Sequence, residues 1–271
     1  MTKTTEKLAE VIQKLEQVVT EDLALLMTEH NFKEADREIR PRIIMSVAAR
    51  EKQGKTHFAL GAPGPIALFN LDIGTEGVVH KFPNKLIIEQ QIEIPAVTST
   101  VISEAQKIWE GFKKANNAVL KSPSIRTIVY DTATELWELI RLAKLGKLTK
   151  VLPHNYTDCN AEFRRIIRKA YSSDKNVIML HKMKAEWVND KRTGQYERAG
   201  FTDVGFLVQV DATIERLPDL PDDATPQFQL VVNESRHNPT LRGAEFSGPD
   251  MCTFQMLAAL TIEGTTPEDW E

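Results

Sequence analysis

The sequence has few cysteines, no long apolar run and no large excess of charge, and each of these absences excludes a class of protein. Cys159 and Cys252 are the only cysteines, too few for a disulfide framework, so we expect a reducing, cytoplasmic setting. No apolar run approaches the roughly 20 residues of a membrane-spanning helix, and the first six residues lack the apolar core of a signal peptide. We therefore expect no membrane contact. The net charge of −4 does not by itself indicate nucleic-acid binding, although it leaves room for a local basic surface.

The most informative segment is residues 49–56, which read A-x-x-x-x-G-K-T. This is the pattern of a phosphate-binding loop with alanine in place of the first glycine. The apolar run 42–48 predicts a strand before the loop, and residues 56–60 predict a helix after it. In such a loop, backbone N–H groups and a helix N-terminus surround a phosphate. We expect the nucleotide to contact Arg50, Glu51, Lys52, Gln53, Gly54, Lys55, Thr56 and His57.

Three residues of this loop have distinct expected roles. Gly54 lets the backbone approach the phosphate closely, Lys55 reaches the β- and γ-phosphate oxygens, and Thr56 offers its hydroxyl to Mg²⁺. The alternative is a plain strand-to-helix turn that happens to carry Gly-Lys-Thr, and the flanking strand and helix patterns argue against it.

Strand and helix patterns alternate along the middle of the chain. Apolar runs at 66–71, 125–131 and 176–181 alternate with helical periodicity at 98–120, 132–145 and 161–171. This alternation predicts an α/β fold with a mostly parallel sheet covered by helices on both faces. Strand-like runs at 204–214 and 228–233, joined by a Pro- and Asp-rich turn at 217–226, predict an antiparallel C-terminal extension.

The N-terminal part differs from the rest. Residues 5–28 carry one apolar stripe at three- and four-residue spacing, which predicts a helix that could restart near Thr20. The charged segment 31–40 ends at Pro41 and is typical of a linker. We therefore expect an N-terminal helical segment, 1–40, and a nucleotide-binding domain, 41–271. The segment either covers the domain's own core or packs on a neighbouring subunit.

Polar residues at the ends of the predicted strands are candidates for catalysis. Asp131 ends an apolar strand, where a carboxylate binds magnesium directly or through water, and it also suits the cap of the next helix. Asp72 and Glu76 follow the strand before it. Either could orient the attacking water, and we favour Glu76. His181 ends a further strand and could sense the γ-phosphate.

Two later segments complete the candidate set. Residues 182–198 mix cations with aromatic rings, which suits phosphates and stacked bases of single-stranded nucleic acid, or else form a solvated hairpin that turns at 190–194. The candidate contacts are Lys182, Lys184, Trp187, Lys191, Arg192, Tyr196 and Arg198. Arg236 follows a strand and could reach the phosphate of a neighbouring subunit, although a plain surface arginine is the default.

In this order, these elements resemble a RecA-like ATPase core over residues 42–260. The specific matches are short: 50–56 resembles the first nucleotide motif, 127–131 the second, 72–77 the acidic loop, 177–182 the sensor strand, and 232–240 the strand end with a trans-acting arginine. Glu234 stands where that last pattern usually has lysine. The compact size most resembles phage-encoded RecA-like proteins, which include single-strand annealing ATPases.

The resemblance implies an ATPase that uses ATP and Mg²⁺ on single-stranded DNA, in a ring or filament, in the cytoplasm of a phage-infected or bacterial cell. It implies catalytic roles for Lys55, Glu76, Asp131, His181 and Arg236, with Thr56 and Asp131 at the metal. A nucleotide-gated scaffold that binds protein rather than DNA is the main alternative. A small-molecule kinase is less favoured, because no clear lid segment is visible.

Overall fold

The computed structural model describes residues 3–35, 37–72, 74–97, 101–147, 152–218 and 225–271. The chain divides into two compact units, Met1–Ile39 and Arg40–Glu271. The first unit holds one helix, α1 (Lys3–Glu29), which continues through Thr20 without the restart that the sequence suggested. None of the helices in the described ranges is long and apolar enough to cross a membrane.

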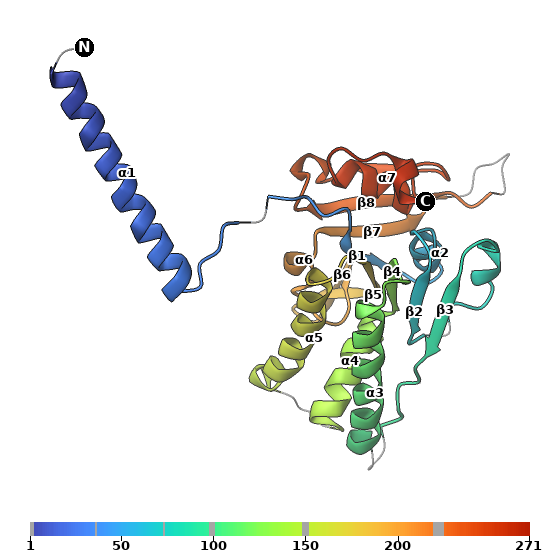
Figure 1. Cartoon of the computed structure of the whole chain (residues 1–271). Helices are drawn as coiled ribbons and strands as arrows, with labels where there is room; N and C mark the ends of the chain where they lie inside the picture. Colours follow the sequence, from blue (N-terminus) through green and yellow to red (C-terminus); the bar gives the residue numbers. More distant parts are fainter. Residues whose placement is uncertain (1–2, 36, 73, 98–100, 148–151, 219–224) are drawn as a thin grey trace. The chain divides into compact units, whose positions relative to one another are not determined.

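The second unit is built on a large sheet (Figure 1). The described strands run in the order β3-β2-β4-β5-β1-β7-β8-β9, and β6 pairs with the extended end of β5. Pairing is parallel from β3 to β7 and antiparallel for β7–β8, β8–β9 and β5–β6. The bounds are β1 (Ile44–Ala49), β2 (Ile66–Asn70), β3 (Ile87–Gln91), β4 (Thr127–Asp131), β5 (Asn176–Val188), β6 (Lys191–Arg198), β7 (Val210–Arg216), β8 (Phe228–Ser235) and β9 (Glu245–Ser247).

Helices cover both faces of this sheet, and each face has its own apolar core. One core packs α3 (Val101–Lys121), α4 (Ala133–Leu145) and α5 (Tyr156–Tyr171) on the sheet, and the other packs α2 (Lys55–Leu60) and α7 (Phe254–Thr261). Figure 1 shows α3, α4 and α5 lying together on one side. Buried β-branched and aromatic residues in the central strands explain this architecture, because parallel strands must be apolar on both faces.

The predicted fold is confirmed: a RecA-like, mostly parallel sheet flanked by helices, with an antiparallel C-terminal extension. One element was predicted wrongly. The apolar run from Val204 begins as a short helix, α6 (Val204–Leu207), and β7 starts only at Val210. A short apolar run fits either state, and here the hydroxyl of Tyr171 donates to the carbonyl of Leu207 at 2.7 Å and holds the turn.

Other differences concern boundaries and missed strands. Edge strand β3 and short strand β9 were not predicted, because neither carries a buried apolar run. The helix expected at 98–120 is described from Val101 onward; residues 98–100 lie outside the described ranges. The same holds for residues 219–224 of the expected turn at 217–226 and for Ile73 of the acidic loop.

The register places the ends of β1, β2 and β4 in one row with the middle of β5. Asn70 of β2 lies beside Asp131 of β4, Asp131 beside Leu180 of β5, and His181 beside Ala48 of β1. This carboxyl edge is where open α/β sheets bind ligands. The fold therefore brings the phosphate loop, Asp131 and the end of β2 to one place.

Candidate nucleotide site

The phosphate-loop segment turns from β1 into α2. Ala49, which replaces the usual glycine, is the last residue of β1, and extended backbone accepts a side chain there. Gly54 has φ +84°, and a Cβ at this position would lie 3.1 Å from the ring of Phe228. The left-handed backbone favours glycine at position 54, and a side chain there would also require the Phe228 ring to shift by a few tenths of an ångström.

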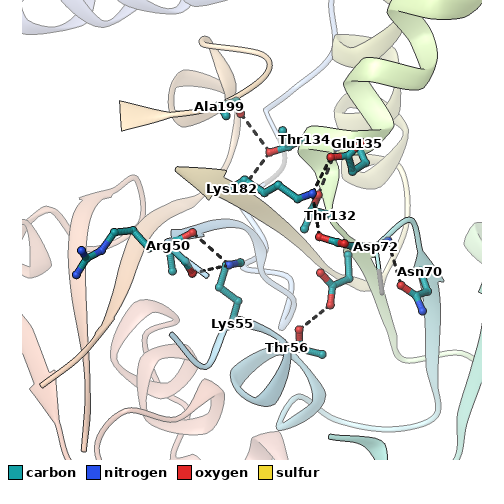
Figure 2. A network of polar contacts seen from close by, with 12 residues as sticks. Arg50, Lys55, Thr56, Asn70, Asp72, Thr132, Thr134, Glu135, Lys182 and Ala199 are labelled. Atoms are coloured by element: carbon teal, nitrogen blue, oxygen red, sulfur yellow. Dashed lines mark hydrogen bonds and ion pairs between the residues drawn. The ribbon is translucent and has the colours of Figure 1, made fainter. Parts of the chain in front are cut away.

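Lys55 lies inside the loop. Its Nζ donates to the carbonyl oxygens of Ala49 at 3.1 Å and Arg50 at 3.0 Å (Figure 2). Burial lowers the pKa of Lys55, and the nearby carboxylates of Asp131 and Asp72 oppose that shift. The ammonium group therefore lies within electrostatic reach of both carboxylates, while its hydrogen bonds go to two backbone carbonyls of the loop.

Thr56 and Asp131 are brought into direct contact. The hydroxyl of Thr56 donates to the carboxylate of Asp131 at 2.7 Å. Asp131 is only 3% exposed, and burial raises its pKa, while the Thr56 hydrogen bond and Lys55 work against that rise. The cap of α4 is Thr132, whose hydroxyl accepts from the Glu135 N–H, so the Asp131 carboxylate is not used as a helix cap.

The two hard oxygen donors of this pair suit Mg²⁺, which prefers hydroxyl, carboxylate, phosphate and water oxygens. Mg²⁺ usually keeps several waters and nucleotide oxygens in its shell, so two protein donors are sufficient. The donor set therefore fits the metal that the sequence predicted.

Asp72, and not Glu76, lies in this cluster. Asp72 is within electrostatic reach of Lys55 and Asp131, and its Oδ2 lies 2.9 Å from the Nζ of Lys182. Asn70 shapes the loop: its Oδ1 accepts from the Asp72 N–H, and its amide donates to Thr75 at 2.8 Å. Glu76 is exposed and makes no hydrogen bond or ion pair with the residues that the structure describes.

Lys182 was expected on the nucleic-acid surface, but the structure places it in the nucleotide cluster (Figure 2). Besides Asp72, its Nζ contacts Oε1 of Glu135 at 2.7 Å. Burial alone would lower the pKa of Lys182, but the hydrogen bonds with Glu135 and Asp72 raise it above its ordinary value. Lys182 is thus a cation at any ordinary pH.

His181, the expected phosphate sensor, is completely buried. Neither ring nitrogen has a partner of hydrogen-bond geometry in the described chain, although the Ala199 backbone lies close enough to favour the charged ring. Burial, and after it the charge of Arg198, hold the pKa of His181 well below its usual range. The ring is therefore neutral, and contact with a γ-phosphate would require a local rearrangement.

The remaining residues of the predicted nucleotide set have varied positions. Arg50, Glu51 and Lys52 are exposed, and the ring of His57 lies 5.0 Å from that of Phe82, where burial lowers the His57 pKa. The side-chain oxygen of Gln53 accepts from the N–H of Arg216, which ties the loop to the end of β7.

Arg236 lies at the end of the sheet opposite the carboxyl ends of the parallel strands. Its N–H donates to the carbonyl of Gln209, and the Gln209 N–H donates to the carbonyl of Ile44 at the start of β1. The full length of β1 therefore separates Arg236 from the phosphate loop. Its guanidinium donates to the carbonyl of Phe206 at 2.7 Å. Arg236 therefore does not reach the nucleotide cluster of its own chain.

The expected nucleic-acid residues separate into two groups on the β5–β6 hairpin. Trp187 and Tyr196 are 58% and 47% exposed, and Lys191 and Arg192 are exposed beside them. Lys184 is exposed and paired with Glu197 at 3.1 Å. At the base, by contrast, Lys182 joins the nucleotide cluster, and Arg198 is ion-paired with Asp211 and only 15% exposed.

One residue of the cluster was missed entirely. Glu135 lies in the first turn of α4, four residues after Asp131, and carries no sequence signal beyond favouring a helix start. Its partner Lys182 was predicted as a nucleic-acid contact, and no sequence pattern indicated its ion pairs with Glu135 and Asp72. Only the approach of β2, α4 and β5 brings the two together.

Comparison with known proteins identifies the family of the domain that carries this cluster. A search of curated proteins found no match to the chain. A family model described as an AAA domain matches residues 42–202, more than half of the chain, from the strand before the phosphate loop to the end of the hairpin. The chain therefore belongs to the AAA domain family and is a P-loop nucleotide-binding protein of the ATPase type.

Proposed function

We propose that this protein is a Mg²⁺-dependent ATPase that acts on single-stranded DNA, in recombination, annealing or replication of the phage type. The observation that carries the proposal is the contact of Thr56 with Asp131, next to Lys55 and Asp72, at the carboxyl edge of the sheet. These are the groups that phosphoryl transfer to water needs: a cation for the phosphates, two oxygens for the metal and a second carboxylate for the water.

Each residue has a proposed role in this reaction. Lys55 binds the β- and γ-phosphates, and Thr56 and Asp131 hold the magnesium, Asp131 directly or through water. When bound, Mg²⁺ neutralises charge that develops on the phosphate oxygens. Asp72 accepts a hydrogen bond from the attacking water, because its carboxylate lies within electrostatic reach of Asp131 and Lys55, whereas Glu76 is exposed.

The roles of Asp72 and Glu76 can be separated by substitution. Asp72→Asn is expected to lower kcat by about 10²-fold or more, the usual contribution of a positioned acid–base group. Glu76→Gln, which changes an exposed side chain, is expected to lose far less. ATP turnover by both variants at saturating Mg²⁺ measures the difference. A larger loss in Glu76→Gln would assign the water to Glu76 after all.

Single-stranded DNA is proposed as the partner because of the outer half of the hairpin. Trp187 and Tyr196 offer two exposed rings, and the guanidinium of Arg192 lies 5.5 Å from the Trp187 ring. Rings stack on bases of any sequence, while cations follow the phosphates. The guanidinium of Arg50, in the phosphate loop, lies 5.1 Å from the ring of Tyr196. A DNA strand bound on this hairpin would therefore lie close to a residue of the phosphate loop.

We expect Trp187→Ala to weaken binding of a single-stranded oligonucleotide by about 5- to 150-fold, since one stacked base contributes about 1–3 kcal/mol. Replacing Lys191 and Arg192 together should reduce the slope of log K against log salt by about 1.4, at about 0.7 per phosphate contact. Fluorescence anisotropy across a salt series measures both effects. The matched control is Phe206→Ala, which removes an aromatic ring that is 82% exposed but lies on α6.

The scaffold alternative rests on α1. A single helix cannot bury its own apolar side chains, and Leu23, Leu25 and Met27 are about half exposed. If wild-type protein hydrolyses ATP but does not bind single-stranded DNA even at low salt, and DNA leaves its turnover unchanged, the scaffold function is favoured instead.

We further propose that the protein assembles into a ring or filament in which Arg236 contacts the nucleotide of the neighbouring subunit. In support, Arg236 lies far from its own nucleotide site, so any phosphate contact would have to be made in trans.

A further inference from the structure

The bridge formed by Lys182 has no role in the reaction described so far. Its Nζ lies between two carboxylates, 2.9 Å from Asp72 and 2.7 Å from Glu135, on elements that are far apart in the sequence. Lys182 is 39% exposed, Asp72 35% and Glu135 24%. An ordinary surface ion pair contributes little to stability, but this one includes the carboxylate proposed to position water.

The backbone of Lys182 is held as firmly as its side chain. Its N–H donates to the hydroxyl of Thr134 at 3.0 Å, and that hydroxyl donates to the carbonyl of Ala199 at 3.3 Å. Figure 2 shows these two bonds. The Ala199 N–H in turn donates to the carbonyl of Lys182 at 2.8 Å, which closes a ring of hydrogen bonds. The ring joins both strands at the base of the hairpin to the first turn of α4.

That turn follows the metal-binding carboxylate directly. Thr134 and Glu135 are the third and fourth residues after Asp131, and Gly200 packs against Thr134 so closely that a Cβ on Gly200 would lie 3.4 Å from the Thr134 Cα. Lys182 also lies beside Ala49, where the phosphate loop begins. The backbone of Lys182 is thus held by α4, by the base of the hairpin and by β1, and its ammonium contacts Glu135 and Asp72. Because Asp72 stands at the start of a loop, it is the partner whose orientation Lys182 can set.

We propose that Lys182 is a positioning residue of the hydrolytic site: with Glu135 as its anchor, it holds the Asp72 carboxylate toward the attacking water and links that carboxylate to the base of the hairpin. The inference rests on the proposed ATPase function and adds two residues, Lys182 and Glu135, to its machinery. If Asp72 is displaced, the protein should still bind nucleotide as before, but its attacking water is poorly oriented. The loss of activity should therefore appear in kcat and not in KM.

The test compares steady-state ATP turnover of wild type, Lys182→Ala, Lys182→Arg and Glu135→Gln. Misplacement of a catalytic group by about 1 Å costs about 10²-fold, so Lys182→Ala should lower kcat by about that factor with KM within about twofold. Arginine can bridge two carboxylates, so Lys182→Arg should recover most of the loss. Glu135→Gln keeps the side-chain shape but removes the charge that pairs with Lys182, so it should also lower kcat.

Lys144→Ala is the matched control. Lys144 lies on α4 as well, is 38% exposed and pairs with Glu162 at 3.8 Å, but far from the nucleotide cluster. Equal kcat in Lys182→Ala and Lys144→Ala, or a loss confined to KM, would overturn the inference while leaving the ATPase proposal intact. Should Lys182→Ala not fold, an unchanged kcat in Glu135→Gln overturns it. Absence of turnover in the wild type, with binding of a fluorescent ATP analogue, would instead count against the proposed function.

Discussion

Replacing Lys55 with alanine is expected to lower ATP hydrolysis by at least about 10²-fold, because loss of one preorganised charge that stabilises a transition state costs about 10²–10³ in rate. Lys182, whose charge influences the Lys55 pKa, is already paired with Asp72 and Glu135 and is therefore not expected to replace it. Phosphate release at saturating ATP and Mg²⁺ measures the effect.

The folded state needs a separate check in this variant, because Lys55 also donates to two loop carbonyls. The melting temperature without nucleotide should fall only slightly, while the rise on adding Mg²⁺ and ATP should largely disappear. Lys114→Ala, an exposed lysine on α3, serves as the matched control and should behave as wild type. Turnover in Lys55→Ala equal to that of the control would remove the basis for a phosphate-binding loop.

Asp131→Asn is expected to abolish Mg²⁺-dependent turnover and, at the same time, to stabilise the protein without nucleotide. The loss of rate should be at least about 10²-fold, since metal-assisted stabilisation of charge contributes several kcal/mol. The gain in stability follows from the pKa of Asp131, which burial raises above its unfolded value. The charged carboxylate is therefore disfavoured in the folded state, and asparagine can still accept the Thr56 hydroxyl.

The size of this stability difference depends on pH. A carboxyl group whose pKa is higher in the folded state destabilises the fold as pH rises from its unfolded pKa through its folded pKa, and the penalty is complete above both. At pH 7, Asp131→Asn should thus melt at a higher temperature than wild type without ligand, with a difference that shrinks in acid. With Mg²⁺ and ATP the order should reverse. Asp250→Asn, at an exposed position, controls for the loss of one charge, and a lower melting temperature for Asp131→Asn at pH 7 would contradict the expectation.

Much of the nucleotide-binding core was predictable because its signals are local. The loop 49–56 needs glycine, lysine and a hydroxyl at set spacing, and the structure shows one reason at Gly54, where a positive φ favours glycine and the Phe228 ring leaves little room for a side chain. Asp131 was identified because parallel strands that alternate with helices end at one edge of the sheet. Buried apolar runs made β1, β2, β4 and the first half of β5 visible in the same way.

The hairpin shows the limit of such patterns. The seven cationic and aromatic residues of segment 182–198 were given one predicted role because they look alike in the sequence. In the structure, cross-strand register and contacts with neighbouring elements place them in different environments. Arg198 is buried against Asp211 of β7, Lys182 reaches Asp72 and Glu135, and Trp187 and Tyr196 remain exposed. Composition cannot tell a cation in solvent from one held by a carboxylate that lies more than a hundred residues away.

Local pattern is thus sufficient for the fold class, for the phosphate loop with Lys55 and Thr56, and for a carboxylate at Asp131, because each follows from backbone geometry within one strand–loop–helix unit. The contact of Asp72 with Lys182, the burial of His181 and the bridge to Glu135 all depend on which strand ends lie side by side. Those contacts join β2, α4 and β5 across the sheet edge. Side-chain partners at such an edge are set by packing between segments that are far apart in the sequence. Local sequence patterns therefore cannot predict them.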